Sequence, residues 1–197
     1  MKLVLASGSP RRAEILRAAG FSFEVLAAGV DETLRPGEAP ADYVRRLAEA
    51  KARAAAKIFS AAEPSAVAMF IGADTTVVAN GAILGKPESP ASAREMLERL
   101  SGRTHEVYTG VALLRLPGGT VHVFEEVTKV EFARMSTEEI AEYISSGEPF
   151  GKAGGYAIQG LGGKFVKRIE GCYFNVMGLP LARLYAELRE MGWSAAP

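Results

Sequence analysis

The sequence predicts an α/β fold with an elongated mixed sheet, flanking helices and several long antiparallel strands. Near the N-terminus a short apolar strand runs directly into a helix, and a long amphipathic helix is expected over 40–59. Two extended segments, 106–116 and 120–133, flank a Pro-Gly-Gly turn and alternate well enough to be paired strands. A chain of 197 residues can bury a proper core, so we expect a single domain over 1–197 with two lobes.

The N-terminal elements carry the clearest local signals. The apolar run 3–6 predicts a short buried strand, and a helix is expected over 10–19. Ser9 suits the N-cap, Pro10 the first helical position and Gly20 the position past the helix end. This arrangement points free backbone N–H groups and the positive end of a helix dipole toward the tip of the strand.

A central strand is predicted by the apolar run 66–72, and we expect it to end at the polar stretch containing Asp74. Residues 77–84 are expected to be its hairpin partner, because Asn80-Gly81 favours a tight turn. Apolar periodicity and helix caps predict the other elements. These are a strand over 21–26, a helix over 90–100 capped by Ser89 and closed by Gly102, a helix from the Ser136 capping box to 146, a glycine-rich section over 147–163, a strand over 164–169 and a helix over 179–191.

The composition is that of an ordinary globular protein, with 48% hydrophobic and 23% charged residues. A formal net charge of +0 argues against a general binder of nucleic acids or membrane surfaces. A single cysteine, Cys172, excludes an internal disulfide and a cysteine-rich zinc site. No apolar run reaches the roughly 18 residues of a membrane span, and the N-terminus does not read as a signal peptide. We therefore expect a soluble, cytoplasmic protein.

Two adjacent arginines, Arg11 and Arg12, occupy the first turn of the N-terminal helix. The helix dipole favours acidic residues there by a few tenths of a kcal/mol. Two cations at an already positive helix end suggest a strongly anionic ligand, for which a phosphate chain is the obvious candidate. The alternative is a solvated surface, since no P-loop or Gly-x-Gly-x-x-Gly motif follows the strand.

Lys51 falls in the middle of an apolar stripe on helix 40–59. The stripe consists of Val44, Leu47, Ala48, Ala55 and Ile58. Either the lysine side chain extends to the edge of the core, or its ammonium crosses the interface between helix and sheet and meets an anion. The nearby arginine pair favours the second interpretation.

Asp74 follows the most hydrophobic strand, where active-site groups of α/β proteins commonly emerge. It could cap a turn, bind Mg²⁺ or take a proton from water. Glu32 or Asp31, in a short loop, could supply a second carboxylate to the same ion. Such oxygen ligands suit Mg²⁺ or Mn²⁺. His105 and His122 lie too far apart in the sequence to suggest a zinc site, and we expect both to be structural.

Several further polar residues are weaker candidates when each is taken alone. Lys86 is stiffened by the following proline, while Arg103 stands at a helix C-terminus, where a cation is expected on dipole grounds. Lys152 and Gln159 belong to a glycine-rich run that allows a ligand to approach the backbone closely, although flexible loops share this composition. The Gln159 amide both donates and accepts, which suits the edge of a nucleobase.

Taken together, these blocks resemble the Maf family of nucleoside triphosphate pyrophosphatases along nearly the whole chain. The matching blocks are Ser7-Gly-Ser-Pro-Arg-Arg12, Val30-Asp-Glu32, Gly72-Ala-Asp-Thr75, Gly85-Lys-Pro87, Ser101-Gly-Arg-Thr-His105, Lys152-Ala-Gly-Gly-Tyr-Ala-Ile-Gln-Gly160 and Gly178-Leu-Pro180. The resemblance implies an elongated fold similar to that of the inosine triphosphatases, with the active site in a cleft between two lobes. One departure is Gly151, where the family usually has Asp.

The resemblance also implies roles for individual residues. Asp74 matches the proton acceptor and Glu32 a carboxylate associated with a divalent metal cation, Mg²⁺ or Mn²⁺. Arg11, Thr75 and Gln159 match the positions that distinguish the branch acting on dTTP and UTP. The phosphate-binding set is matched by Ser7, Arg12, Lys51 and Lys86, of which Lys51 and Lys86 are the expected catalytic cations, and we add Arg103 and Lys152 as substrate-binding candidates.

The resemblance thus predicts hydrolysis of dTTP, UTP and modified pyrimidine nucleotides to the monophosphate and pyrophosphate, which limits incorporation of non-standard nucleotides. One alternative is a 7-methyl-GTP pyrophosphatase, although this chain follows the other branch at all three distinguishing positions. Another is a nucleotide-binding regulator of cell division without significant turnover. The expected partner is a nucleoside triphosphate, with neither nucleic acid nor membrane, and a homodimer is a further expectation.

Overall fold

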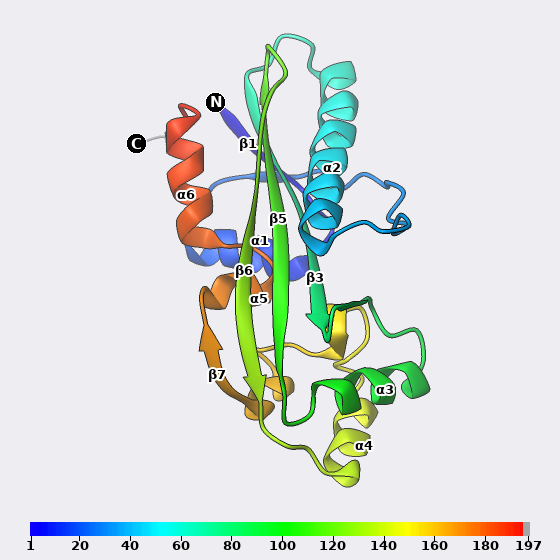
Figure 1. Ribbon diagram of the computed structural model, residues 1–197. Helices are drawn as coiled ribbons and strands as arrows, with labels where there is room; N and C mark the ends of the chain where they lie inside the picture. Colours follow the sequence, from blue (N-terminus) through cyan, green and yellow to red (C-terminus); the bar gives the residue numbers. More distant parts are fainter. Residues whose placement is uncertain (195–197) are drawn as a thin grey trace. The chain divides into compact units, whose positions relative to one another are not determined.

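The computed structural model describes residues 1–194 and has a seven-stranded mixed sheet with flanking helices (Figure 1). The strand order is β2-β1-β3-β5-β6-β7, and β4 pairs with β3. Strand β1 is parallel to β2 and β3, whereas β3 with β4 and β6 with β7 are antiparallel. The predicted fold class is therefore confirmed. The elements are β1 (Lys2–Ala6), α1 (Pro10–Ala18), β2 (Glu24–Val25), α2 (Pro40–Ala62), β3 (Ala68–Ala79), β4 (Ala82–Leu84), α3 (Pro90–Leu100), β5 (Thr104–Leu116), β6 (Thr120–Phe132), α4 (Thr137–Ser145), the short 3₁₀ helices η1 (Ala153–Gly155) and η2 (Leu161–Phe165), β7 (Val166–Glu170), α5 (Tyr173–Met177) and α6 (Leu181–Glu190).

The chain forms two compact units, to which β3, β5 and β6 each contribute residues. Unit 1 comprises Met1–Asp74, Thr109–Glu126 and the described residues from Gly178 onward. Unit 2 comprises Thr75–Tyr108 and Val127–Met177.

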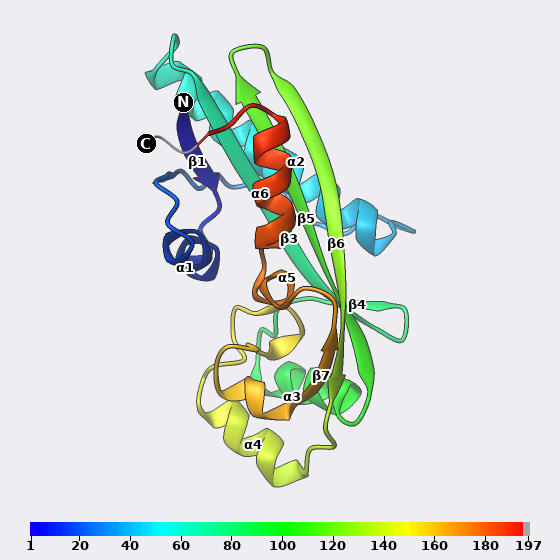
Figure 2. The ribbon, with the colours of Figure 1, turned by 90° about the vertical axis from the view of Figure 1, so that its left-hand side faces the viewer.

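Helix α2 packs against the strands of unit 1 with alanines at the contact. Ala48, Ala52 and Ala55 are fully buried, in one cluster with Phe70 of β3 and other strand residues. These small side chains let the helix approach the sheet closely. Figure 2 shows α6 in front of the strands and α2 behind them, so the two helices cover opposite faces.

Two strand glycines make this approach possible. A Cβ at Gly72 of β3 would overlap the backbone of Ala48 and Ala52, and a Cβ at Gly110 of β5 would overlap that of Val44. Side chains alternate along a strand, so Asp74, two residues after Gly72, points to the face that α2 covers. The close approach thus brings the middle of α2 next to Asp74.

Two expectations for these elements were wrong. Strand β3 continues to Ala79 instead of ending in the polar stretch that contains Asp74, because Val77, Val78 and Ala79 pair with β4. The tight turn itself is where it was predicted, with positive φ at Asn80 and Gly81. On α2, Ile58 is 50% exposed and the buried stripe continues through Phe59 instead.

Most helix boundaries follow the predicted caps. Gly20 follows α1 with a positive φ, and Ser89 and Ser136 both form capping boxes. Ser9 is the N-cap of α1, but no side-chain capping bond is formed there.

The second strand was predicted over 21–26 and contains only Glu24 and Val25. The helix α5 was not predicted at all, since its five residues carry no periodic signal.

The core of unit 2 is built from aromatic and aliphatic side chains. Phe132, Tyr143, Tyr156 and Phe165 are buried together, with α3 supplying Leu97 and other residues. Helices α3 and α4 lie next to each other in this unit (Figure 1).

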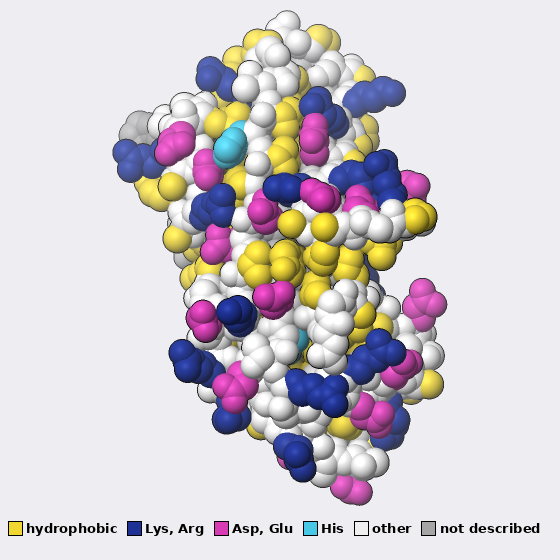
Figure 3. All heavy atoms as spheres, in the orientation of Figure 1, with side chains coloured by type: hydrophobic (Ala, Val, Ile, Leu, Met, Phe, Trp, Pro, Cys, Tyr) yellow, Lys and Arg dark blue, Asp and Glu magenta, His cyan; other side chains and the backbone are white. Residues whose placement is uncertain are grey.

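No helix within residues 1–194 is both long and apolar enough to cross a membrane. On the face shown in Figure 3, basic and acidic side chains are interspersed over the described residues. This distribution agrees with the balanced formal charge.

Candidate active site

Lys51 lies at the centre of the charged group in unit 1. Its Nζ is 2.7 Å from Asp74 Oδ1 and 2.6 Å from Glu32 Oε1. The side chains of Lys51 and Asp74 are only 13% and 12% exposed, whereas that of Glu32 is 44% exposed. The ammonium therefore leaves the apolar stripe of α2 and joins a buried carboxylate on β3 to one that reaches solvent.

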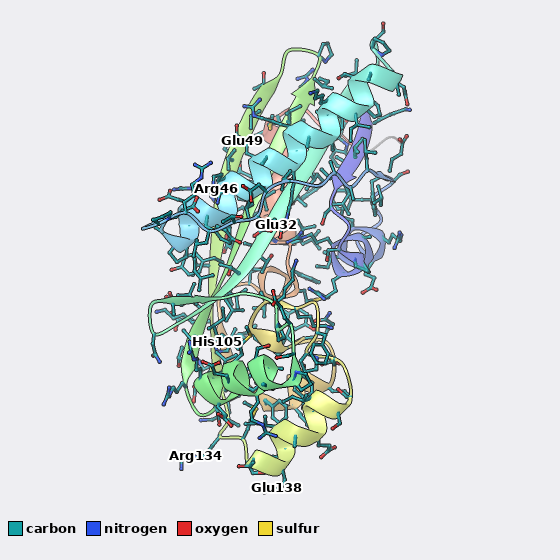
Figure 4. The ribbon with its side chains drawn as sticks, turned by 90° about the vertical axis from the view of Figure 1, so that its right-hand side faces the viewer. Glu32, Arg46, Glu49, His105, Arg134 and Glu138 are labelled. Carbon is teal, nitrogen blue, oxygen red and sulfur yellow. The ribbon has the colours of Figure 1, made fainter. Side chains whose placement is uncertain are left out.

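Glu32 is carried by the loop between β2 and α2, and that loop is tied to the helix. The Tyr43 hydroxyl donates to the Glu32 carbonyl oxygen at 3.0 Å. The Arg46 guanidinium donates to both carboxylate oxygens of Glu38, at 2.5 and 2.8 Å, and to the Thr33 carbonyl at 3.0 Å. Figure 4 shows Glu32 and Arg46 close to α2. These bonds fix the backbone at Glu32 and Thr33.

Tyr43 and Arg46 were not singled out from the sequence. The only local signal is that they stand three residues apart in the first turns of α2, and so on one face of the helix. Asp31, the alternative second carboxylate, accepts from the Thr33 backbone N–H at 2.9 Å and is exposed. The structure thus brings Glu32 to Lys51 and gives Asp31 a role within the loop.

Arg12 belongs to the first turn of α1 and is buried. Its Nη1 donates to Ser7 Oγ at 2.9 Å and to the Ala73 carbonyl at 2.8 Å, and its Nε donates to the Gly178 carbonyl at 2.7 Å. Burial lowers the pKa of this guanidinium, while the Asp74 carboxylate acts in the opposite direction. Arg12 thereby links the end of β1 to β3 next to Asp74 and to the segment before α6.

Arg11 differs from its neighbour in exposure. It is half-buried, and burial lowers the pKa of its guanidinium. The two arginines of the first turn therefore occupy different environments.

In unit 2, the predicted residues come from β3 and four loops. Lys86 is exposed on the loop after β4, and this loop is joined to the glycine-rich segment by a hydrogen bond of 3.0 Å from Gly154 N to the Gly85 carbonyl. Lys152 Nζ donates to the Glu148 carbonyl at 2.5 Å. Thr75 is half-buried on β3.

Gln159 and Arg103 are both exposed in unit 2. Gln159 lies between η1 and η2. Arg103 follows the positive-φ Gly102, and its carbonyl accepts from the Phe132 N–H at 3.0 Å.

The two histidines are structural in the way the sequence suggested. His105 Nε2 lies 2.8 Å from the Tyr156 hydroxyl within an aromatic cluster, and burial lowers the pKa of the imidazole to about 4. His122 Nε2 lies 2.8 Å from Glu187 Oε2. Across residues 1–194, no cluster of three or more His, Cys, Asp or Glu side chains could hold a metal ion.

The pair formed by Glu32 and Asp74 nevertheless has suitable chemistry for a hard cation. Both carboxylates converge on one positive charge, the Lys51 ammonium. Mg²⁺ is usually bound by one or two carboxylates together with water and substrate phosphates, so a third protein ligand is not required. These two side chains fit such an ion.

Comparison with known proteins gives a consistent result. A family model described as "Maf-like protein" matches residues 2–191. The dTTP/UTP pyrophosphatase of Carboxydothermus hydrogenoformans is 50% identical over 196 residues, covering 98% of this chain and 100% of that protein. Those of Hahella chejuensis and Syntrophus aciditrophicus are 49% and 48% identical, covering 98% and 97% of this chain and 95% and 90% of theirs.

One solved structure, that of the Staphylococcus aureus Ham1 protein, shares the fold. The TM-score is 0.54 at 16% sequence identity, and the match covers 97% of this chain and 100% of that one. At this identity the likeness concerns the fold alone, and it supports the expected inosine triphosphatase-like architecture.

Proposed function

Because the chain belongs to the Maf-like protein family, we propose that it is a nucleoside triphosphate pyrophosphatase acting on dTTP and UTP. The products are the nucleoside monophosphate and pyrophosphate. The observation that carries the proposal is the Lys51 ammonium held between Asp74 and Glu32. In this arrangement a proton acceptor, Asp74, and a cation, Lys51, lie within hydrogen-bond distance of each other. The partly exposed carboxylate of Glu32 connects this pair to solvent.

In the proposed reaction, a water molecule attacks the α-phosphorus of the substrate. Asp74 accepts a proton from this water, a new P–O bond forms, and the bond from the α-phosphorus to the bridging oxygen breaks, so that pyrophosphate leaves. The Lys51 ammonium donates a hydrogen bond to Asp74 Oδ1 and so orients the carboxylate before the attack. Fixed charges of this kind stabilise a transition state because they need no reorganisation.

Glu32 and Asp74 are the residues that we propose to hold a divalent cation, Mg²⁺ or Mn²⁺. When bound, such an ion neutralises charge on the phosphate oxygens. The hydrogen bonds from Tyr43 and Arg46 to the carbonyl oxygens of Glu32 and Thr33 hold the backbone that carries this ligand.

The other predicted residues receive roles in the same proposal. Arg12 and Ser7 would shape the phosphate-binding end of β1, since the Arg12 guanidinium is fixed by two backbone carbonyls and by the Ser7 hydroxyl. Lys86, Lys152 and Arg103 would contact phosphate oxygens. Arg11, Thr75 and Gln159 would select the base, with the Gln159 amide pairing with O4 and N3–H of a pyrimidine. A lost hydrogen bond of this kind discriminates more strongly than a missing methyl group, so dTTP and UTP would both be accepted.

The decisive experiment is pyrophosphate release from a panel of nucleoside triphosphates by the wild type and by Asp74→Asn. We expect release from dTTP and UTP that the variant loses. Preferential release from 7-methyl-GTP would replace the substrate assignment. Binding of nucleotides without turnover would instead favour a regulatory protein. We further propose that the enzyme acts on the cytoplasmic nucleotide pool, and its expected homodimer can be tested by light scattering.

A further inference from the structure

The glycine-rich turn 157–162 in unit 2 is attached to two neighbouring side chains, Tyr143 and Glu148. Glu148 Oε1 accepts from the Gly162 N–H at 2.9 Å, and Oε2 accepts from the Leu161 N–H at 2.9 Å. The Tyr143 hydroxyl donates to Glu148 Oε1 at 2.8 Å and accepts from the Ala157 N–H at 3.3 Å. The turn is therefore held at both ends by one Tyr–Glu pair.

Two glycines of the turn leave the space that the Tyr143 and Glu148 side chains occupy. A Cβ at Gly160 would overlap the Glu148 carboxylate, and a Cβ at Gly162 would overlap the Tyr143 hydroxyl. Neither position can take a larger residue without displacing the pair. Glycine at these two positions therefore allows the backbone of the turn to pack directly against the side chains of Glu148 and Tyr143.

The ionisation of Glu148 agrees with its role as an acceptor. Burial alone would raise the pKa of this carboxyl, but the Gly162 and Leu161 N–H groups, the Tyr143 hydroxyl and the nearby Lys152 outweigh burial and lower it. The carboxylate form is thus the one that the turn stabilises. Tyr143 is 2% exposed, so its hydroxyl lies in the core and not in solvent.

Gln159 stands in the middle of this turn and is exposed, while Ala157 on one side and Gly162 on the other are buried. An exposed glutamine on a free loop would sample many positions, and ordering it on binding would cost affinity. When the flanking backbone is fixed, the Gln159 side-chain amide samples fewer positions before the ligand binds, so less entropy is lost on binding. The hydrogen bonds of Tyr143 and Glu148 fix that backbone.

We infer that Glu148, assisted by Tyr143, is a positioning residue for nucleobase recognition, because it fixes the turn that presents the Gln159 amide. This inference rests on the proposed function only in assigning the pyrimidine base to Gln159. Neither side chain needs to touch the substrate, so their effect passes through the backbone of residues 157–162.

The test is a comparison of Glu148→Gln, Tyr143→Phe and Gln159→Ala with the wild type on dTTP and dCTP. Glu148→Gln preserves shape but replaces one acceptor oxygen with a donor. We expect it to raise KM for dTTP about tenfold, to change kcat less than twofold, and to lower the preference for dTTP over dCTP by a similar factor. These magnitudes correspond to losing one well-made hydrogen bond. Tyr143→Phe should act in the same direction but more weakly.

The control is Glu142→Gln on α4, the helix that carries Tyr143, where an exposed carboxylate lies 4.0 Å from Lys164. It should leave both KM and base preference unchanged, since exposed ion pairs of this kind contribute little. Because Glu148 acts through Gln159, the double variant Glu148→Gln/Gln159→Ala should be no less selective than Gln159→Ala alone. An additive loss, or an equal loss of rate on every nucleotide, would overturn the inference.

Hydrogen exchange separates positioning from a general loss of stability. In Glu148→Gln, amides 161 and 162 should exchange at least tenfold faster, while β3 and α3 keep their protection. If amides 161 and 162 exchange as slowly in Glu148→Gln as in the wild type, Glu148 does not hold the turn and the inference is refuted. If the wild type binds a non-hydrolysable dTTP analogue but does not release pyrophosphate, the proposed function fails. The same variants then test the inference through the affinity ratio for dTTP and dCTP analogues. If the wild type hydrolyses dTTP and the variants keep its base preference, the inference fails alone.

Discussion

The Lys51 ammonium lies 2.7 Å from Asp74 Oδ1, across the interface where α2 passes closest to β3. The contact depends on Gly72, whose missing side chain lets the helix backbone approach, and on the alternation that turns Asp74 toward the same face. The side chains of Lys51 and Asp74 are mostly buried. Glu32, which also contacts the Lys51 ammonium, is partly exposed and connects the pair to solvent.

Asp74→Asn should reduce pyrophosphate release from dTTP by at least about 10²–10³-fold, since a group that acts only in the transition state has that order of effect. The amide preserves the shape of the side chain, so the midpoint of thermal unfolding should change little. Steady-state kinetics together with circular dichroism would check both statements. A rate close to that of the wild type would remove Asp74 from the proposed role.

Lys51→Met should lower both activity and stability. It removes a cationic donor from a buried carboxylate, which costs about 1–3 kcal/mol when a polar group loses its partner. Chemical denaturation measures this change. Lys57→Met is the matched control, because Lys57 lies on the same helix and is exposed. Equal stability of the two variants would show that the pair at Lys51 contributes nothing to folding.

Removing divalent cations with a chelator should abolish turnover, and added Mg²⁺ or Mn²⁺ should restore it. Glu32→Gln should raise the Mg²⁺ concentration needed for half-maximal rate by about tenfold, as expected when one of two carboxylate ligands is lost. Glu49→Gln, on the exposed side of α2 where Glu49 pairs with Arg53, is the control. Metal titration by calorimetry gives a readout that does not depend on activity. An unchanged requirement in Glu32→Gln would separate this residue from the ion.

The buried His105 should make folding stability depend on pH between about 4 and 6.5. Burial lowers the pKa of His105 from 6.5 to about 4, so in this window the unfolded chain binds a proton that the folded chain does not. The unfolding free energy is therefore highest above the unfolded pKa and falls as the pH is lowered toward 4. Thermal unfolding from pH 7 to 4.5 should show a shallower fall for His105→Gln. An identical slope would mean that other groups govern acid sensitivity.

Gly151 and Gly154 should respond differently to substitution by alanine. Both have positive φ, so each substitution carries a backbone strain of about 1–2 kcal/mol. A Cβ at Gly151 meets open space, whereas one at Gly154 would lie about 3 Å from the Val77 side chain. Gly154→Ala should therefore lower the unfolding midpoint more than Gly151→Ala. For the same reason Gly151→Asp, which introduces the residue expected there from the family resemblance, should fold and keep its activity within a few-fold of the wild type.

Helix boundaries were predictable because their signals are local. The capping boxes at Ser89 and Ser136 and the glycine after α1 act within a few residues of the chain. The length of β3 was not predictable in this way. Its continuation past Asp74 depends on hydrogen bonds with β4, and Asp74 itself looks like a strand terminator in the sequence. Ile58 was misplaced because a helical projection does not show where the covering sheet ends.

By itself, the sequence determined the family, the fold class and the chemical types present at the site: carboxylates, cations and one amide. The sequence motifs hold that information because each is a short run of residues whose chemistry can be recognised locally. Only the tertiary structure decided which of these side chains contact one another. It placed Lys51 between Asp74 and Glu32, buried Arg12 against backbone carbonyls, and attached the turn of Gln159 to Tyr143 and Glu148. These contacts join residues far apart in the chain, and their geometry depends on how closely helix, strand and turn can pack.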